Sequence, residues 1–122
     1  MQKLSEVKNR YNEKLKEYQM YYVDSVVGSD RKIKNQMKKK ADEVSIPLKY
    51  YEAEVRTIES LINWLEQLVK QLQESLHLMN NEVNDKEKIK TTYGSLRFYE
   101  DCYNKEIGQL TALQNLLSYL KS

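Results

Sequence analysis

The sequence predicts an all-α fold: an elongated antiparallel bundle of three to four helices with a coiled-coil heptad seam. Glycine and proline together account for only 4 of the 122 residues, and charged residues make up 31%. This composition favours long helices over sheets and loops. Apolar residues also recur at alternating spacings of three and four, which is typical of a helix with a narrow buried seam. This heptad run comprises Ala41, Val44, Leu48, Tyr51, Val55, Ile58, Ile62, Leu65, Val69, Leu72, Leu76, Met79 and Val83.

Four helical segments are expected within a single domain, residues 1–122. Their approximate bounds are 3–27, 30–44, 46–83 and 85–121. In the first segment, apolar residues from Leu4 to Tyr22 recur at helical spacing, and Gly28 follows as a helix terminator. Ser29 or Asp30 is then expected to cap the second segment, because a short polar side chain can accept a hydrogen bond from a free backbone N–H.

The third segment is expected to begin near Ser45, with Pro47 inside its first turn, where proline is tolerated. A kinked continuation of the second segment is the alternative, because the heptad run passes Pro47 without interruption. Asn84, followed three residues later by Glu87, predicts a capping box for the fourth segment. Gly94 is a weak point at which that last helix could kink or break.

Composition and motifs favour a cytoplasmic, non-enzymatic protein. A lone cysteine, Cys102, allows no internal disulfide and favours a reducing compartment. The first residues do not read as a signal peptide, and no stretch of about 18 apolar residues predicts a membrane span. His77 is the only histidine and has no ligand-type residues at metal-binding spacing. We therefore expect no catalytic residues, cofactor, metal, membrane or small-molecule substrate.

Charge is distributed unevenly, although the net charge is only +2. Residues 1–49 carry a net +5 and residues 50–84 a net −4. Six cations within ten residues form a candidate polyanion-binding site, because closely spaced cations can contact consecutive phosphates. Packing against the acidic side chains of the third segment is the alternative. The candidate site comprises Arg31, Lys32, Lys34, Lys38, Lys39 and Lys40, and the acidic side chains are Glu52, Glu54, Glu59 and Glu66.

The middle of the third segment is a candidate protein interface. Its heptad run could form the seam of a homo-oligomer or the core of a monomeric bundle. Trp64 lies off this run, and the sequence favours its packing against another helix of the same chain over contact with a partner. The candidate interface residues are Val55, Ile58, Leu61, Ile62, Trp64, Leu65, Leu68, Val69, Leu72 and Leu76.

The stretch Asn63-Trp64-Leu65-Glu66-Gln67-Leu68-Val69-Lys70, with the Tyr21-Tyr22 pair and the lysine-rich segment upstream, is similar to phage recombination-mediator proteins of the UvsY kind. The resemblance covers part of the chain and includes no diagnostic motif. It implies a small helical oligomer that binds single-stranded DNA and is encoded by a phage or another mobile element.

Taken as a whole, the sequence predicts a self-associating protein–protein interaction module, which would be an adaptor, structural subunit or small inhibitor. An oligomeric single-stranded nucleic-acid-binding accessory protein using residues 31–40 is the alternative.

Overall fold

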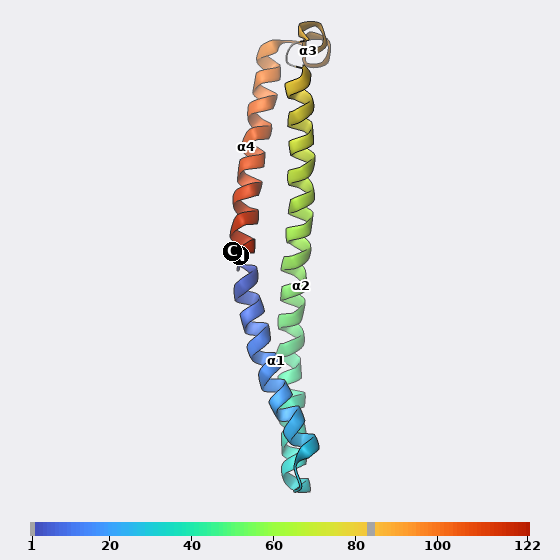
Figure 1. Ribbon diagram of the computed structural model, residues 1–122, viewed down its shortest axis with the longest axis vertical. Helices are drawn as coiled ribbons and strands as arrows, with labels where there is room; N and C mark the ends of the chain where they lie inside the picture. Colours follow the sequence, from blue (N-terminus) through green and yellow to red (C-terminus); the bar gives the residue numbers. More distant parts are fainter. Residues whose placement is uncertain (1, 83–84) are drawn as a thin grey trace. The chain divides into compact units, whose positions relative to one another are not determined.

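The computed structural model describes residues 2–82 and 85–122, which form four helices and no strands (Figure 1). The helices are α1 (Leu4–Val27), α2 (Arg31–Glu82), α3 (Lys86–Tyr93) and α4 (Leu96–Lys121). The predicted all-α class is therefore confirmed. The chain divides into two compact units, each described separately below. Unit 1 comprises Met1–Ser60 with Leu120–Ser122, and unit 2 comprises Leu61–Tyr119.

In unit 1, α1 lies antiparallel to the first part of α2 (Figure 1). The contacts follow that direction: Lys8 Nζ lies 3.8 Å from Glu59 Oε1, and Arg10 Nη2 lies 2.9 Å from Glu54 Oε2. Val7 and Ala41 are buried between the two helices' apolar stripes, whereas most other apolar residues of this unit remain partly or fully exposed. A layer of two helices therefore leaves much of its apolar surface open.

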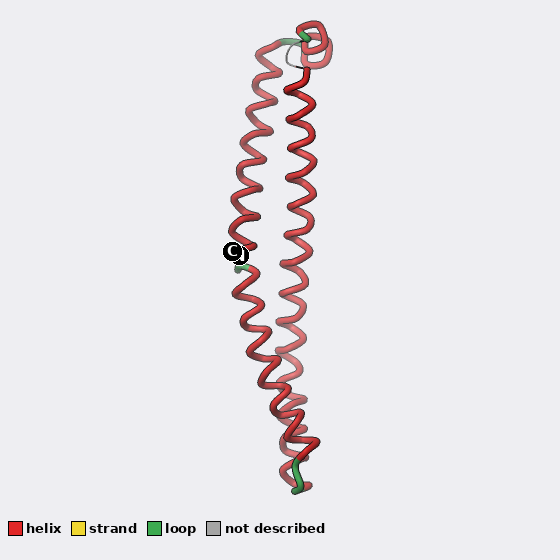
Figure 2. The backbone as a smooth tube through the Cα atoms, in the orientation of Figure 1, coloured by secondary structure: helices red, strands yellow, loops and turns green. Residues whose placement is uncertain are grey.

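A short connection joins α1 to α2, as the tube in Figure 2 shows. Gly28 ends α1, as expected from the sequence. Of the two candidate caps, the structure selects Asp30, whose carboxylate accepts a 2.9 Å hydrogen bond from the backbone N–H of Lys32. This bond satisfies one of the N–H groups that the first helical turn leaves without a partner.

The predicted boundary between residues 44 and 46 is wrong, because α2 continues through Pro47. Proline in a helix interior removes one backbone hydrogen bond and crowds the preceding turn, which costs about 3 kcal/mol. Continuation is nevertheless preferred, since the heptad run keeps the same face of the helix packed on both sides of Pro47. The alternative of a continuing helix was the correct one.

The expected helix 85–121 is also divided, into α3 and α4. Gly94 adopts φ 81°, a left-handed conformation that glycine reaches without steric cost, and its N–H donates to Lys90 O. Ser95 then accepts a hydrogen bond from Phe98 N–H and caps α4. Asp85 caps α3 by accepting a hydrogen bond from Lys88 N–H at 3.0 Å. The capping box predicted at Asn84 lies outside the described residues.

In unit 2, α4 lies antiparallel to the second part of α2, and α3 joins their packing at one end (Figure 1). Met79 of α2, Ile89 of α3 and Tyr99 of α4 form a buried cluster. The Tyr99 hydroxyl donates a 2.5 Å hydrogen bond to Met79 O. Because this carbonyl belongs to the last turn of α2, the hydroxyl supplies a partner that the helix itself is not expected to provide.

The heptad run forms the inner face of α2. Each of its twelve described positions, from Ala41 to Met79, is buried or half-buried, and Val83 lies outside the described residues. Within each unit this stripe faces the chain's own neighbouring helix. Interlocking of its side chains in coiled-coil fashion stays a prediction of the spacing.

Candidate interaction surfaces

The six cations of the candidate polyanion-binding site, here called the basic surface, lie in the first three turns of α2. Five are exposed and Lys34 is half-buried. Among the residues that the structure describes, no ion pair involves any of the six, and Lys40 Nζ lies 5.6 Å from the centre of the Tyr21 ring. The first turn of α2 contains no acidic residue. Because a helix N-terminus carries partial positive charge, cations there are electrostatically unfavourable unless an anion binds.

The acidic side chains expected to pack against the basic surface lie farther along the same helix, because α2 is continuous, and three of them pair elsewhere. Glu54 and Glu59 pair with Arg10 and Lys8 of α1, and Glu52 pairs with Arg56 one turn along α2. The attraction between the basic and acidic parts of the sequence therefore acts between α1 and α2. The acidic residues nearest to the basic surface on α2 are instead Asp42 and Glu43, one turn beyond Lys38 and Lys39.

A lysine, rather than Ile33, occupies the inward position at the start of α2. Lys34 lies seven residues before Ala41 and continues the heptad run, so it takes the inward position, while Ile33 is 50% exposed. The aliphatic stem of Lys34 fits beside Gly28, where an added Cβ would lie 3.4 Å from Lys34 Cγ. The long stem can pack there while its ammonium group reaches water.

A second surface, here called the Trp64 face, comprises Leu61, Trp64 and Leu68 in unit 2. Spacings of three and four place these residues on one side of α2. Trp64 is 57% exposed, and Leu61 and Leu68 are half-buried. The interpretation that Trp64 packs against another helix of the chain is therefore wrong. Two neighbouring helices cover the heptad run but do not extend over this side of α2.

The other candidate interface residues point inward. Ile62, Leu65, Val69 and Leu76 are buried, and Val55, Ile58 and Leu72 are half-buried. The chain's own helices thus occupy this stripe, and the Trp64 face lies beside it.

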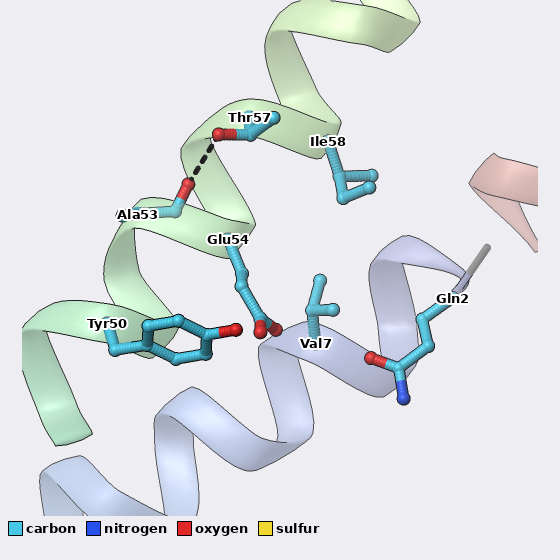
Figure 3. Close-up of a pocket in the computed structure, with 7 residues that line it drawn as sticks. All are labelled: Gln2, Val7, Tyr50, Ala53, Glu54, Thr57 and Ile58. Carbon is cyan, nitrogen blue, oxygen red and sulfur yellow. Dashed lines mark hydrogen bonds between the residues drawn. The ribbon is translucent and has the colours of Figure 1, made fainter.

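A hollow of about 310 Å³ lies between α1 and α2 in unit 1, and Figure 3 shows its lining. Val7 of α1 faces Tyr50, Glu54 and Ile58 of α2 across it. Its polar groups are largely paired, because Thr57 donates to Ala53 O at 2.8 Å and Glu54 accepts from Arg10. Sequence reasoning did not identify this hollow, because only the alignment of α1 on α2 brings these residues together.

Arg10 is the central side chain beside this hollow. Its Nη2 donates to Gln2 Oε1 as well as to Glu54, and its guanidinium lies 5.4 Å from the centre of the Tyr51 ring. The carboxylate of Glu54 and the ring of Tyr51 thus both stabilise the partly buried positive charge of Arg10. We interpret this group as a link between α1 and α2.

The potential metal ligands and nucleophiles are dispersed. Cys102 is half-buried against the Met79–Ile89–Tyr99 cluster, and His77 is exposed with Nε2 3.4 Å from Asn81 Nδ2. In residues 2–82 and 85–122, no group of three or more His, Cys, Asp or Glu residues is arranged to hold a metal ion. None of the described helices combines the length and apolarity needed to cross a bilayer.

Comparison with family models, curated proteins and solved structures gave no match. The properties of the basic surface and the Trp64 face are therefore the basis for a functional proposal. Both surfaces display side chains that binding partners could bury or neutralise, and they belong to different units.

Proposed function

We propose that this protein is a non-enzymatic interaction and assembly module that self-associates through the Trp64 face. The observation that carries the proposal is the exposure of Trp64 between two further apolar residues on the same side of α2. Tryptophan is enriched among the residues that dominate binding energy, and these residues act when an interface removes them from water. A self-associating chain of this kind would serve as a structural subunit or adaptor.

The accessible surface area supports a further partner. Folded monomeric proteins of 14.6 kDa expose about 6,900 Å², whereas this chain exposes 9079 Å². The difference, about 2,200 Å², exceeds the area of about 800 Å² that each partner contributes to an interface of standard size. In unit 2, large apolar side chains contribute to this area. Besides Trp64 they include Leu78, Leu96, Phe98, Ile107, Leu116 and Tyr119.

A charge placed in the Trp64 face tests the proposal. We expect Trp64→Glu to convert an oligomer of the wild-type chain into a 14.6 kDa monomer, because a carboxylate cannot be buried there without a partner. Light scattering coupled to size exclusion measures the mass. Asn63→Glu is the matched control, since it adds the same charge at a neighbouring exposed position of α2. A wild-type chain that remains monomeric at every concentration would overturn self-association.

Fluorescence gives a second measure at the same residue, because Trp64 is the only tryptophan. If the Trp64 face is buried on association, its emission should shift to shorter wavelength as the protein concentration rises. An emission spectrum that stays constant while the mass increases would place the interface elsewhere on the chain.

The basic surface supports a second candidate function, binding of a polyanion such as single-stranded nucleic acid. Its support is the combination of six cations within ten residues, five of them exposed, with their location at a helix N-terminus. Binding of this type would not depend on base sequence and would weaken steeply with salt.

Charge reversal tests the second candidate. The variant Lys38→Glu, Lys39→Glu, Lys40→Glu should lose affinity for a fluorescent single-stranded oligonucleotide at least tenfold at low salt, since each phosphate contact contributes through counterion release. The control carries the same charge change at Lys16, Lys49 and Lys70, which are exposed elsewhere. Circular dichroism verifies that both variants remain helical. Equal loss in both variants would contradict a local binding site.

A further inference from the structure

The turn between α1 and α2 exposes aliphatic side chains beside the basic surface. Val27 is 75% exposed, and Val23 and Val26 are exposed on the same end of α1. On the α2 side, Ile33 projects from the first turn, among Arg31, Lys32 and Lys34. We refer to Val23, Val26, Val27 and Ile33 as the turn aliphatics.

The two sets of side chains belong to one local structure. Val27 and Ile33 line the same shallow hollow of about 300 Å³, together with Asp24, Gly28 and Met37. Residues 23–43 contain the six cations of the basic surface and four acidic residues, Asp24, Asp30, Asp42 and Glu43, so their net charge is +2. Asp30 already accepts a hydrogen bond from the helix backbone. The turn thus combines exposed aliphatic surface with excess positive charge.

This combination distinguishes between classes of polyanion. Single-stranded nucleic acid binds cations through its phosphates and aromatic rings through its base faces. It has no hydrocarbon region in which exposed valine and isoleucine side chains could be buried. Tyr22 is exposed near this turn, yet its ring stacks on Tyr18 with centroids 6.1 Å apart. An anionic bilayer offers phosphates and, directly beneath them, hydrocarbon that can bury aliphatic side chains.

We propose that the turn of unit 1 docks on the surface of an anionic phospholipid bilayer. The turn aliphatics enter the boundary between headgroups and acyl chains, and the basic surface contacts the lipid phosphates. This inference rests on the second candidate function, polyanion binding, and names its partner. It concerns attachment at the surface, whereas the sequence-based expectation of no membrane rested on the lack of an apolar run long enough to span one.

Vesicle co-sedimentation of the full chain tests the proposal, with phosphatidylcholine vesicles compared with vesicles that also contain phosphatidylserine. We expect binding only to the anionic vesicles and a decrease with salt, because the cations supply much of the attraction. Ile33→Asn should weaken this binding about tenfold through loss of aliphatic burial. Ile46→Asn is the matched control, since Ile46 is also an exposed isoleucine of α2 in unit 1, and it should bind like the wild type.

The other outcomes separate this inference from the function on which it rests. Vesicle binding that Ile33→Asn leaves unchanged would overturn insertion of the turn aliphatics. Binding of the oligonucleotide without binding of anionic vesicles would overturn the lipid proposal while leaving polyanion binding in place. If the chain binds neither probe at low salt, both proposals fail.

Discussion

Leu65→Ala is expected to lower the free energy of unfolding by about 3 kcal/mol, because removal of a buried leucine side chain loses its transfer free energy and leaves a cavity. Leu65 is 2% exposed and lies in the middle of the heptad run, in unit 2. Its side chain contributes to the apolar contact between two long helices, which have no third layer to close around a void. Urea denaturation followed by circular dichroism at 222 nm, a wavelength sensitive to helix, measures the change.

Leu78→Ala is the matched control for this prediction. Leu78 lies on the same helix and in the same unit but is 60% exposed. The same chemical change should therefore alter stability by no more than about 0.5 kcal/mol, as for most surface substitutions. Equal destabilisation by the two variants would contradict the assignment of the heptad run to the inner face of α2.

Pro47→Ala is expected to raise the free energy of unfolding by about 2 kcal/mol. Alanine restores the missing backbone hydrogen bond to Glu43 O and removes the steric conflict of the proline ring, a gain of about 3 kcal/mol. Greater freedom of the unfolded chain offsets up to about 1 kcal/mol of this gain. The same denaturation measurement, together with an increase in helical circular dichroism, reports the effect.

Lys49→Ala provides the control for Pro47→Ala. It introduces alanine at an exposed position two residues away, where helix propensity changes by only a few tenths of a kcal/mol. If Pro47→Ala instead destabilised the protein, the proline would be holding a bend that the packing of unit 1 requires. That result would contradict the interpretation of Pro47 as an unfavourable residue tolerated for the sake of the heptad run.

The periodicity of apolar residues was sufficient to predict the helical class and the inner face of α2. Each described position of the heptad run is buried or half-buried, because side chains at these spacings share one side of a helix. Helix ends were less predictable. At Pro47 the continuous apolar face prevailed over the local preference for a helix start. At Gly94 the local preference prevailed, since glycine took a left-handed conformation and ended α3.

The candidate surfaces were only partly predictable. The cations of the basic surface are contiguous in sequence, so their clustering required no tertiary information. The exposure of Trp64 and Ile33 could not be predicted in this way, because it depends on which sides of α2 the neighbouring helices leave uncovered. Pairing of Glu54 with Arg10 likewise depends on the alignment of two helices whose residues are 44 positions apart.

The close fit between Gly28 and Lys34 also has a consequence for how unit 1 folds. These residues are six positions apart, and Lys40 meets Tyr21 over a separation of nineteen, whereas Lys8 and Glu59 are fifty-one positions apart. Contacts near the turn close short loops and cost less chain entropy than distant ones. We therefore expect pairing of α1 with α2 to nucleate at the turn and propagate away from it, so that the half-buried lysine helps to set the register before most of the apolar contacts form.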